Sequence, residues 1–288
     1  MSQLLEILEY PFNQRALLIA MLIGFANGFL SGFIVLRRSA LMVGSLAHTL
    51  LPGIALAIAT FGVLNAFTAF FGALFAALLV GLGAILVSRN SRLDGDSALA
   101  ILYTTAFAGG LLLVDRMSVN SELEHWLFGN ILGLSDADLW LAFGVSALIL
   151  LCLASLRRPL VIMLFEPAVA ETLGIPVRSL SYLLMALMVL GLITSLQAVG
   201  CILSLSLLVA PASIVYLFSN SPRALFWGGA IIGALSAAAA VFLSNLLGVR
   251  TGACIVLLLG GLFGIAFLIS PRYGLLAAVG KVPSQHDH

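Results

Sequence analysis

The chain has 288 residues, of which 62% are hydrophobic and only 9% are charged. A water-soluble domain carries roughly a quarter charged residues, so this chain has too few charges to cover a surface that faces water. The formal net charge is +1, without a basic block or interleaved basic and aromatic residues, so nucleic acid binding has no support in the sequence. The apolar excess predicts an all-α fold, a polytopic membrane helical bundle.

Nine apolar segments are candidate membrane spans, because a bilayer core about 30 Å thick needs roughly 20 apolar residues in a helix. The second segment contains Pro52-Gly53 and the seventh contains Pro211, and both are short. We expect these two to be broken, tilted or re-entrant, which makes eight or nine spans in total. The segments are Ala16–Leu36, Ser45–Thr60, Phe61–Val87, Ser97–Val114, Leu139–Leu156, Leu180–Leu203, Ser206–Phe218, Ala224–Leu247 and Ala253–Ser270.

The chain is expected to have three parts. Residues 1–15 form an N-terminal interfacial segment, because Glu6 and Glu9 precede the first basic residue and the pattern is not that of a cleavable signal. Residues 16–271 form a single transmembrane domain, and residues 272–288 form a C-terminal tail.

The basic residues orient the bundle, because cytoplasmic loops carry an excess of Lys and Arg. Ten of the thirteen basic residues lie inside if the cytoplasmic set is Arg37-Arg38, Arg89, Arg92, Arg157-Arg158, Arg178, Arg223, Arg272 and Lys281. Arg15, Arg116 and Arg250 then lie outside, as does the acidic loop 115–138. The loop 157–179 and the C-terminus are cytoplasmic in this orientation.

His48 is the one ionisable residue well inside an expected span. Such residues are costly in hydrocarbon and usually functional, and neutral imidazole is a good ligand for Mn, Fe, Zn and Cu ions. One histidine is not a metal site, but two copies facing each other across a dimer axis form part of one. The alternative is a histidine hydrogen-bonded to a neighbouring helix, and spacing alone does not separate the two.

Softer polar residues and glycines also fall inside the spans. Gln197 and Ser204 belong to a polar stretch interrupted by glycine and proline, which suits a cavity lining or, equally, plain interhelical hydrogen bonds. Gly24, Gly28 and Gly32 recur every four residues on one helix face, which predicts close helix packing.

The run from Arg37-Arg38 through His48 to Leu51-Pro52-Gly53 resembles the signature of the manganese/zinc/iron ABC permease family, the ABC-3 type. Members typically read as arginine, a hydrophobic residue, then G-D-A-x-S-H-x-x-L-P-G. Four further stretches resemble family segments in order and spacing, so that the similarity covers roughly residues 16–270. They are Asp96–Ile101, Leu127–Gly133, Phe165–Ile175 and Gln197–Ala212.

The resemblance implies a permease subunit of an importer for divalent Mn, Fe or Zn, in the bacterial inner membrane, with no cofactor of its own. It implies as partners a second permease copy, two cytosolic ATP-binding subunits and an extracytoplasmic metal-binding protein. The chain has no G-x-x-x-x-G-K-[ST] motif, so a partner must hydrolyse ATP. His48 is then a pathway or gate residue, and the path is lined by Ser45, Thr49, Pro52, Gln197 and Ser204.

The family resemblance also implies a coupling element on the cytoplasmic side, formed by Glu166, Pro167, Ala170 and Gly174. Its short helix is expected to dock into a groove on the ATP-binding subunit. The charge distribution assigns this loop to the same side without reference to the family.

The signature departs from the family at two positions, because the family's Asp falls at Gly44 and its Ser at Ala47. Asp and His four residues apart would share one helical face and bind a metal, but only His48 remains. The Leu-Pro-Gly variant resembles the manganese/iron branch. The metal then passes with carbonyl, serine or water ligands, or another chain contributes residues.

Two other functions stay open at this point. A wide apolar cavity would suit a permease for an organic metal chelate or a vitamin. An intramembrane enzyme needs paired catalytic groups, which one buried ionisable residue does not supply.

Overall fold

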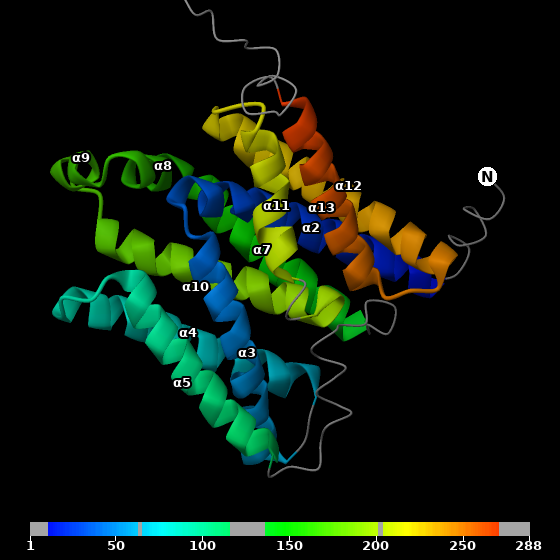
Figure 1. The fold of residues 1–288 in the computed structure, drawn as a ribbon, viewed down its shortest axis with the longest axis horizontal. Helices are drawn as coiled ribbons and strands as arrows, with labels where there is room; N and C mark the ends of the chain where they lie inside the picture. The colour runs from blue at the N-terminus through cyan, green and yellow to red at the C-terminus, as the bar shows by residue number, and fades with distance from the viewer. Residues whose placement is uncertain (1–10, 63–64, 116–135, 201–203, 271–288) are drawn as a thin grey trace, which may run out of the picture.

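The computed structural model describes residues 11–62, 65–115, 136–200 and 204–270, and every regular element in these ranges is a helix (Figure 1). Eight of these helices are long and apolar enough to cross a membrane, and α11 is a shorter apolar helix of 13 residues. The prediction of an all-α bundle with eight or nine spans is confirmed. The helices are α2 (Pro11–Arg37), α3 (Ala40–Phe61), α4 (Ala66–Asn90), α5 (Gly95–Asp115), α7 (Asp136–Ser155), α8 (Arg157–Phe165), α9 (Pro167–Thr172), α10 (Val177–Val199), α11 (Ser204–Tyr216), α12 (Pro222–Leu247) and α13 (Thr251–Ile269).

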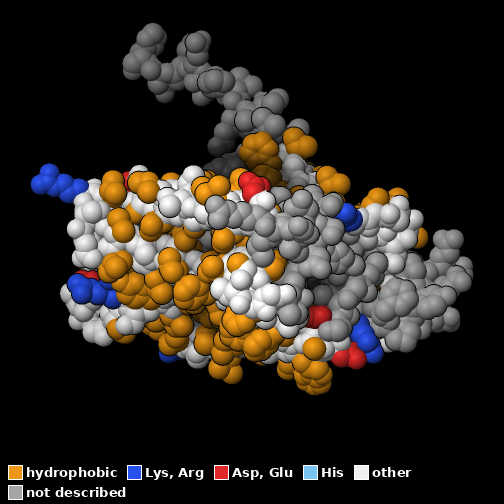
Figure 2. Space-filling view, turned by 90° about the horizontal axis from the view of Figure 1, so that it is seen from below, with side chains coloured by type: hydrophobic (Ala, Val, Ile, Leu, Met, Phe, Trp, Pro, Cys, Tyr) orange, Lys and Arg blue, Asp and Glu red, His pale blue; other side chains and the backbone are white. Residues whose placement is uncertain are grey.

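The outer surface of the bundle is apolar over wide areas. Hydrophobic side chains gather over the middle of the face in Figure 2, and the Lys and Arg side chains lie toward its left and right ends. Along α4 the large exposed side chains recur every three or four residues, which makes one exposed apolar stripe. This stripe consists of Phe67, Phe71, Phe75, Leu79, Leu82 and Leu86.

The helix α3 is longer and more regular than the sequence suggested. It begins at Ala40 and continues through Pro52 without a break. Proline is tolerated inside a membrane helix where neighbouring helices pack over the freed backbone, and Pro52 is buried under α5. Of the two segments expected to be broken, tilted or re-entrant, this one is therefore a single helix of spanning length.

The turn between α3 and α4 lies later than expected. Gly62 ends α3 in the left-handed region, with φ +68° and its N–H donated to the Ile58 carbonyl. Asn65 then caps α4, accepting a hydrogen bond from the Thr68 backbone N–H, while the Thr68 hydroxyl accepts one from the Asn65 N–H. This capping box starts the helix five residues after Phe61, where the sequence prediction began the span.

The second short segment forms a separate helix after α10. The helix α10 ends at Val199, where Gly200 takes a positive φ of 94°. The helix α11 contains Pro211, and the next backbone N–H, that of Ala212, donates to the Ser31 hydroxyl of α2 at 2.8 Å. A hydroxyl group of α2 thus accepts a hydrogen bond from the backbone N–H that follows the proline.

The glycines of α2 form a close seam with α12. A Cβ on Gly28 would lie 2.2 Å from the Gly229 carbonyl oxygen, and one on Gly24 would lie 2.4 Å from that of Gly233. Such distances leave no room for any side chain, so the two backbones touch directly. The predicted packing role of this glycine repeat is confirmed.

Arginine side chains make contacts at both ends of the bundle. Arg15 and Asp136, both assigned to the outside, form an exposed ion pair of 3.0 Å. At the opposite end Arg89 of α4 lies over the Tyr182 ring of α10, 5.0 Å from its centroid. The N-terminal residues 1–10, most of the acidic loop, the Leu127–Gly133 stretch and the tail from residue 271 lie outside the described residues.

Candidate translocation and coupling sites

The His48 side chain is exposed in this chain, although it lies within an apolar span. Two aromatic rings of α5 lie beside it. The Tyr103 ring stacks at 6.2 Å between centroids with 26° between the planes, and the Phe107 ring approaches edge-on at 6.2 Å and 78°. The imidazole is therefore positioned by ring contacts with α5, and sequence reasoning missed both rings because they lie 55 and 59 residues away.

A close helix contact sets the distance between α3 and α5. A Cβ built on Gly110 would lie only 2.3 Å from the Cβ of Pro52. On the other side of α3, a Cβ on Gly53 would lie 2.4 Å from the Gly72 carbonyl oxygen of α4. The Pro-Gly pair thus lets α4 and α5 approach α3 from two sides, and the α5 contact brings Tyr103 to His48.

The expected path residues on α3 divide between two environments. Ser45 is half-buried and donates its hydroxyl to the Leu41 carbonyl at 3.0 Å. Thr49 is fully buried and donates to the Leu46 carbonyl at 2.7 Å, and Pro52 is buried. His48 is therefore the accessible polar group among these four, with Ser45 partly accessible one turn before it.

The polar side chains near the end of α10 mainly form hydrogen bonds within α10 and to α2. Thr194 donates to the Leu190 and Gly191 carbonyls at 3.0 Å, and Ser195 donates to Gly191 at 2.8 Å. Asn27 of α2 donates its amide to Gly191 at 3.3 Å and to the Ser195 hydroxyl. Ser204 is fully buried at the start of α11, and the Gln197 side chain lies outside the described part.

Asn27 is a buried polar residue that the sequence prediction did not single out. Its side chain is fully buried, and its amide oxygen has no partner among the described residues. The available signal was an amide in the middle of an otherwise apolar span. Its role in the fold is to join α2 to α10 by hydrogen bonds.

The position of the missing family carboxylate is open enough for a side chain. Gly44 is half-buried, and a Cβ there would meet Leu205 of α11 at an ordinary 3.5 Å. Among the described residues no group of three His, Cys, Asp or Glu side chains could hold a metal ion. Within the described part of the chain, His48 therefore has no second or third side chain of these types beside it that would complete a metal site.

The expected coupling element, Glu166–Gly174, contains the short helix α9, which lies with the preceding helix α8 at one end of the bundle (Figure 1). Pro167 occupies the first turn of α9, and Ala170 is fully buried against the bundle. Gly174 ends α9 with φ +73°, and the Ile175 N–H returns to the Ala170 carbonyl at 3.0 Å. This Schellman ending requires a left-handed residue, which explains the glycine.

The same element exposes a short apolar stripe. Phe165 ends α8, Val169 lies on α9 and Leu173 caps the end of α9, and these side chains are 56%, 46% and 62% exposed. Glu166 is exposed beside them. A stripe of this kind on two short helices outside the spans is typical of a protein-docking surface.

Known proteins match this chain over nearly its full length. A family model described as the ABC 3 transport family matches residues 9–270. The manganese transport system membrane protein MntC of Halalkalibacterium halodurans is 38% identical over 272 residues, 94% of this chain and 91% of that protein. The "Probable iron transport system membrane protein" of Haemophilus influenzae is 34% identical over 267 residues, 93% and 97% of the two chains. The solved structure of PsaBC from Streptococcus pneumoniae in complex with Fab is 32% identical, with a TM-score of 0.83 over 96% of this chain and 99% of that one.

Proposed function

This chain belongs to the ABC 3 transport family, and on that premise we propose that it is the permease subunit of an ATP-binding-cassette importer for divalent transition metal ions. Manganese and iron are favoured over zinc, because relatives over 30% identical along nearly the whole chain are named for manganese and iron transport. The eight spanning helices support a multi-pass membrane subunit. ATP hydrolysis belongs to a separate chain.

The exposed imidazole of His48 is the main observation that supports a transport path along this face of α3. A polar ring at mid-span is costly against lipid, so a second copy of the permease is expected to cover it. Two imidazoles facing each other would then supply two nitrogen ligands along a path between the copies.

Metal uptake by the reconstituted transporter tests this path. His48→Ala is expected to lower the uptake rate of manganese or iron while assembly is kept, because it removes the accessible nitrogen ligand. Leu257→Ala on α13 is the matched control, since Leu257 is 75% exposed and lies far along the chain from the α3–α5 contact. Unchanged uptake in well-folded His48→Ala would remove the residue from the path.

Coupling to the ATP-binding subunit is assigned to α8 and α9. The exposed stripe of Phe165, Val169 and Leu173 supports docking, while buried Ala170 would transmit movement of α9 to the bundle. Glu166→Lys adds a reversed charge beside the stripe and is expected to reduce both ATPase association and uptake. Copurification of an ATP-binding subunit with the wild-type chain would support this assignment. Normal stimulated ATPase activity in Glu166→Lys would contradict it.

The remaining features of the importer follow the same scheme. An extracytoplasmic metal-binding protein delivers the ion to the end that carries Arg15 and Asp136. The arginine-bearing end, α9 and the C-terminus face the cytosol. Thiol labelling of single cysteines in α9 and near Arg15, from each side of sealed vesicles, tests this orientation.

Cargo identity is tested separately from the mechanism. Free manganese and iron are expected to compete with each other for uptake, while an organic chelate of the same metal does not compete. Competition by the chelate but not by the free ions would favour a metal-chelate permease instead.

A further inference from the structure

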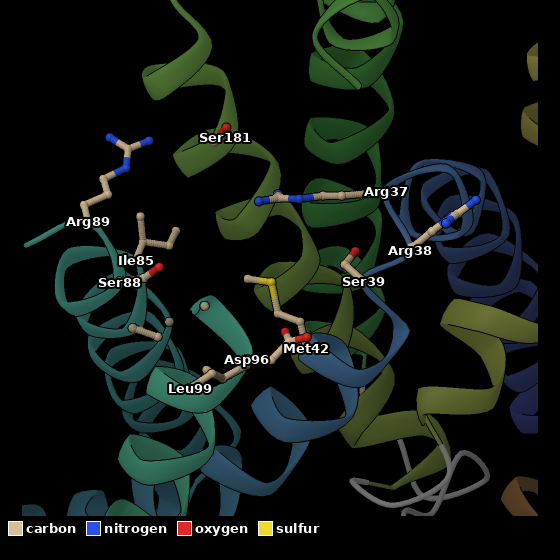
Figure 3. A pocket seen from close by; sticks show the side chains of 13 residues that line it. Arg37, Arg38, Ser39, Met42, Ile85, Ser88, Arg89, Asp96, Leu99 and Ser181 are labelled. Carbon is tan, nitrogen blue, oxygen red and sulfur yellow. The ribbon is translucent and has the colours of Figure 1, made fainter. Parts of the chain in front are cut away.

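A pocket of about 370 Å³ lies at the arginine-bearing end of the bundle, away from His48 (Figure 3). The ends of α2 and α4 and the beginnings of α3, α5 and α10 surround it. Its lining holds three guanidinium groups, from Arg37, Arg38 and Arg89, and one carboxylate, from Asp96. We call it the arginine pocket, and its formal lining charge of three positive against one negative disfavours a metal cation.

The guanidinium groups of the arginine pocket are short of partners. The Nη1 atom of Arg37 is buried and has no hydrogen-bond partner among the described residues. Arg89 contacts the Tyr182 ring through its charge, and none of the three arginines forms an ion pair within the described part of the chain. A buried charged donor without an acceptor is costly, so this geometry calls for an anionic ligand.

The orientation of the side chains shows where such a ligand would sit. In Figure 3 the Arg37 side chain reaches from the end of α2 across the pocket toward the side that carries Arg89 and Ser181, while Arg38 points outward at the rim. Arg37 and Arg89 therefore flank one space from two helices. A planar guanidinium pairs with two oxygens of one phosphate, which makes a phosphate group the best-matched anion.

The rest of the lining favours a phosphate that carries an apolar body. Met42, Ile85 and Leu99 line the same pocket as the arginines. The arginines close the ends of membrane-spanning helices, which is the depth of lipid headgroups, and basic pockets between such helices bind anionic headgroups. We propose that the arginine pocket binds a phosphate group, with an anionic phospholipid of the cytoplasmic leaflet as its expected source and free phosphate as the other.

Native mass spectrometry of the full-length chain tests this site. The chain is reconstituted in nanodiscs of phosphatidylcholine with a minor fraction of phosphatidylglycerol, then released into detergent and weighed. Wild-type chain is expected to retain phosphatidylglycerol, and Arg37→Gln and Arg89→Gln each weaken retention by about tenfold, because each removes charge-assisted hydrogen bonds. Asp96→Asn is expected to strengthen retention, since it removes the one negative charge in the lining.

Arg92→Gln is the matched control, because Arg92 is exposed in the same α4–α5 turn but does not line the pocket. A parallel lipid-free sample is titrated with inorganic phosphate while its thermal unfolding is followed. Stabilisation by phosphate that depends on Arg37 and Arg89 identifies free phosphate as the source, and lipid retention with the same dependence identifies the headgroup. The proposed site would be overturned if neither lipid retention nor stabilisation by phosphate depended on Arg37 and Arg89, or if Arg92→Gln weakened them equally. It would also be overturned if the pocket were occupied only when a protein subunit copurified with the chain.

Discussion

The contact between Gly110 of α5 and Pro52 of α3 can be tested with a single methyl group. A Cβ at position 110 would lie 2.3 Å from the Pro52 Cβ and 2.5 Å from its Cα, where ordinary contacts begin at 3.4 Å. The helices must therefore separate locally by about 1 Å in Gly110→Ala, and overpacking of this kind costs about 1–3 kcal/mol. The same displacement moves Tyr103 and Phe107 away from His48.

The neighbouring glycine provides the control for this prediction. A Cβ on Gly109 would have nothing within 4 Å in this chain, and alanine in place of glycine inside a helix stabilises by about 0.5–1 kcal/mol. Gly110→Ala should therefore be about 1.5–4 kcal/mol less stable than Gly109→Ala in a denaturant titration of the detergent-solubilised protein. It should also transport metal more slowly. Equal stability of the two variants would refute the packing account of the α3–α5 contact.

Three further predictions address the metal path, the coupling helix and a helix cap. Gly44→Asp should fold normally, because a Cβ at this position meets only an ordinary 3.5 Å contact. It should bind manganese more tightly in isothermal titration, because it places a carboxylate one helical turn from the His48 imidazole. Unchanged manganese affinity would refute the idea that positions 44 and 48 share one metal-binding face of α3. Gly174→Trp should uncouple ATP hydrolysis from uptake, because a non-glycine residue is strained at φ +73°; normal coupling would contradict the assignment. Hydrogen bonds from Ser97 hold the pKa of the Asp94 carboxyl below its usual 3.8. The contribution of the ionised Asp94 side chain to protein stability, through the start of α5, should therefore be complete above about pH 5 and decline as the pH falls below about 4. The difference in thermal midpoint between wild type and Asp94→Asn should follow that course, and a constant difference down to acid pH would count against it.

The spans were predictable because the bilayer imposes a simple rule on the chain. Every backbone polar group in hydrocarbon must be paired within its own helix, so long apolar runs reveal the helices before any packing is known. The boundaries were harder, because caps are made by one or two residues. Asn65 and Thr68 moved the start of α4, and the effect of Pro52 depended on what covered it.

The candidate sites were only partly visible in the sequence. His48 stood out as an ionisable residue in an apolar run, and the coupling segment stood out through its resemblance to a family. The polar residues around position 195 proved to be engaged in hydrogen bonds with their own helix and with Asn27. Their types were compatible with a cavity or with packing, and only the neighbours could decide.

Composition and charge placement alone established a multi-span membrane protein with an arginine-bearing end, because hydropathy and the distribution of Lys and Arg act along the chain. The tertiary structure decided which helices touch. It placed Tyr103 and Phe107 against His48, brought Gly110 onto Pro52, and gathered Arg37, Arg89 and Asp96 from three helices around one pocket. Such contacts depend on how the helices cross in space, and no local pattern of residues encodes the crossing geometry.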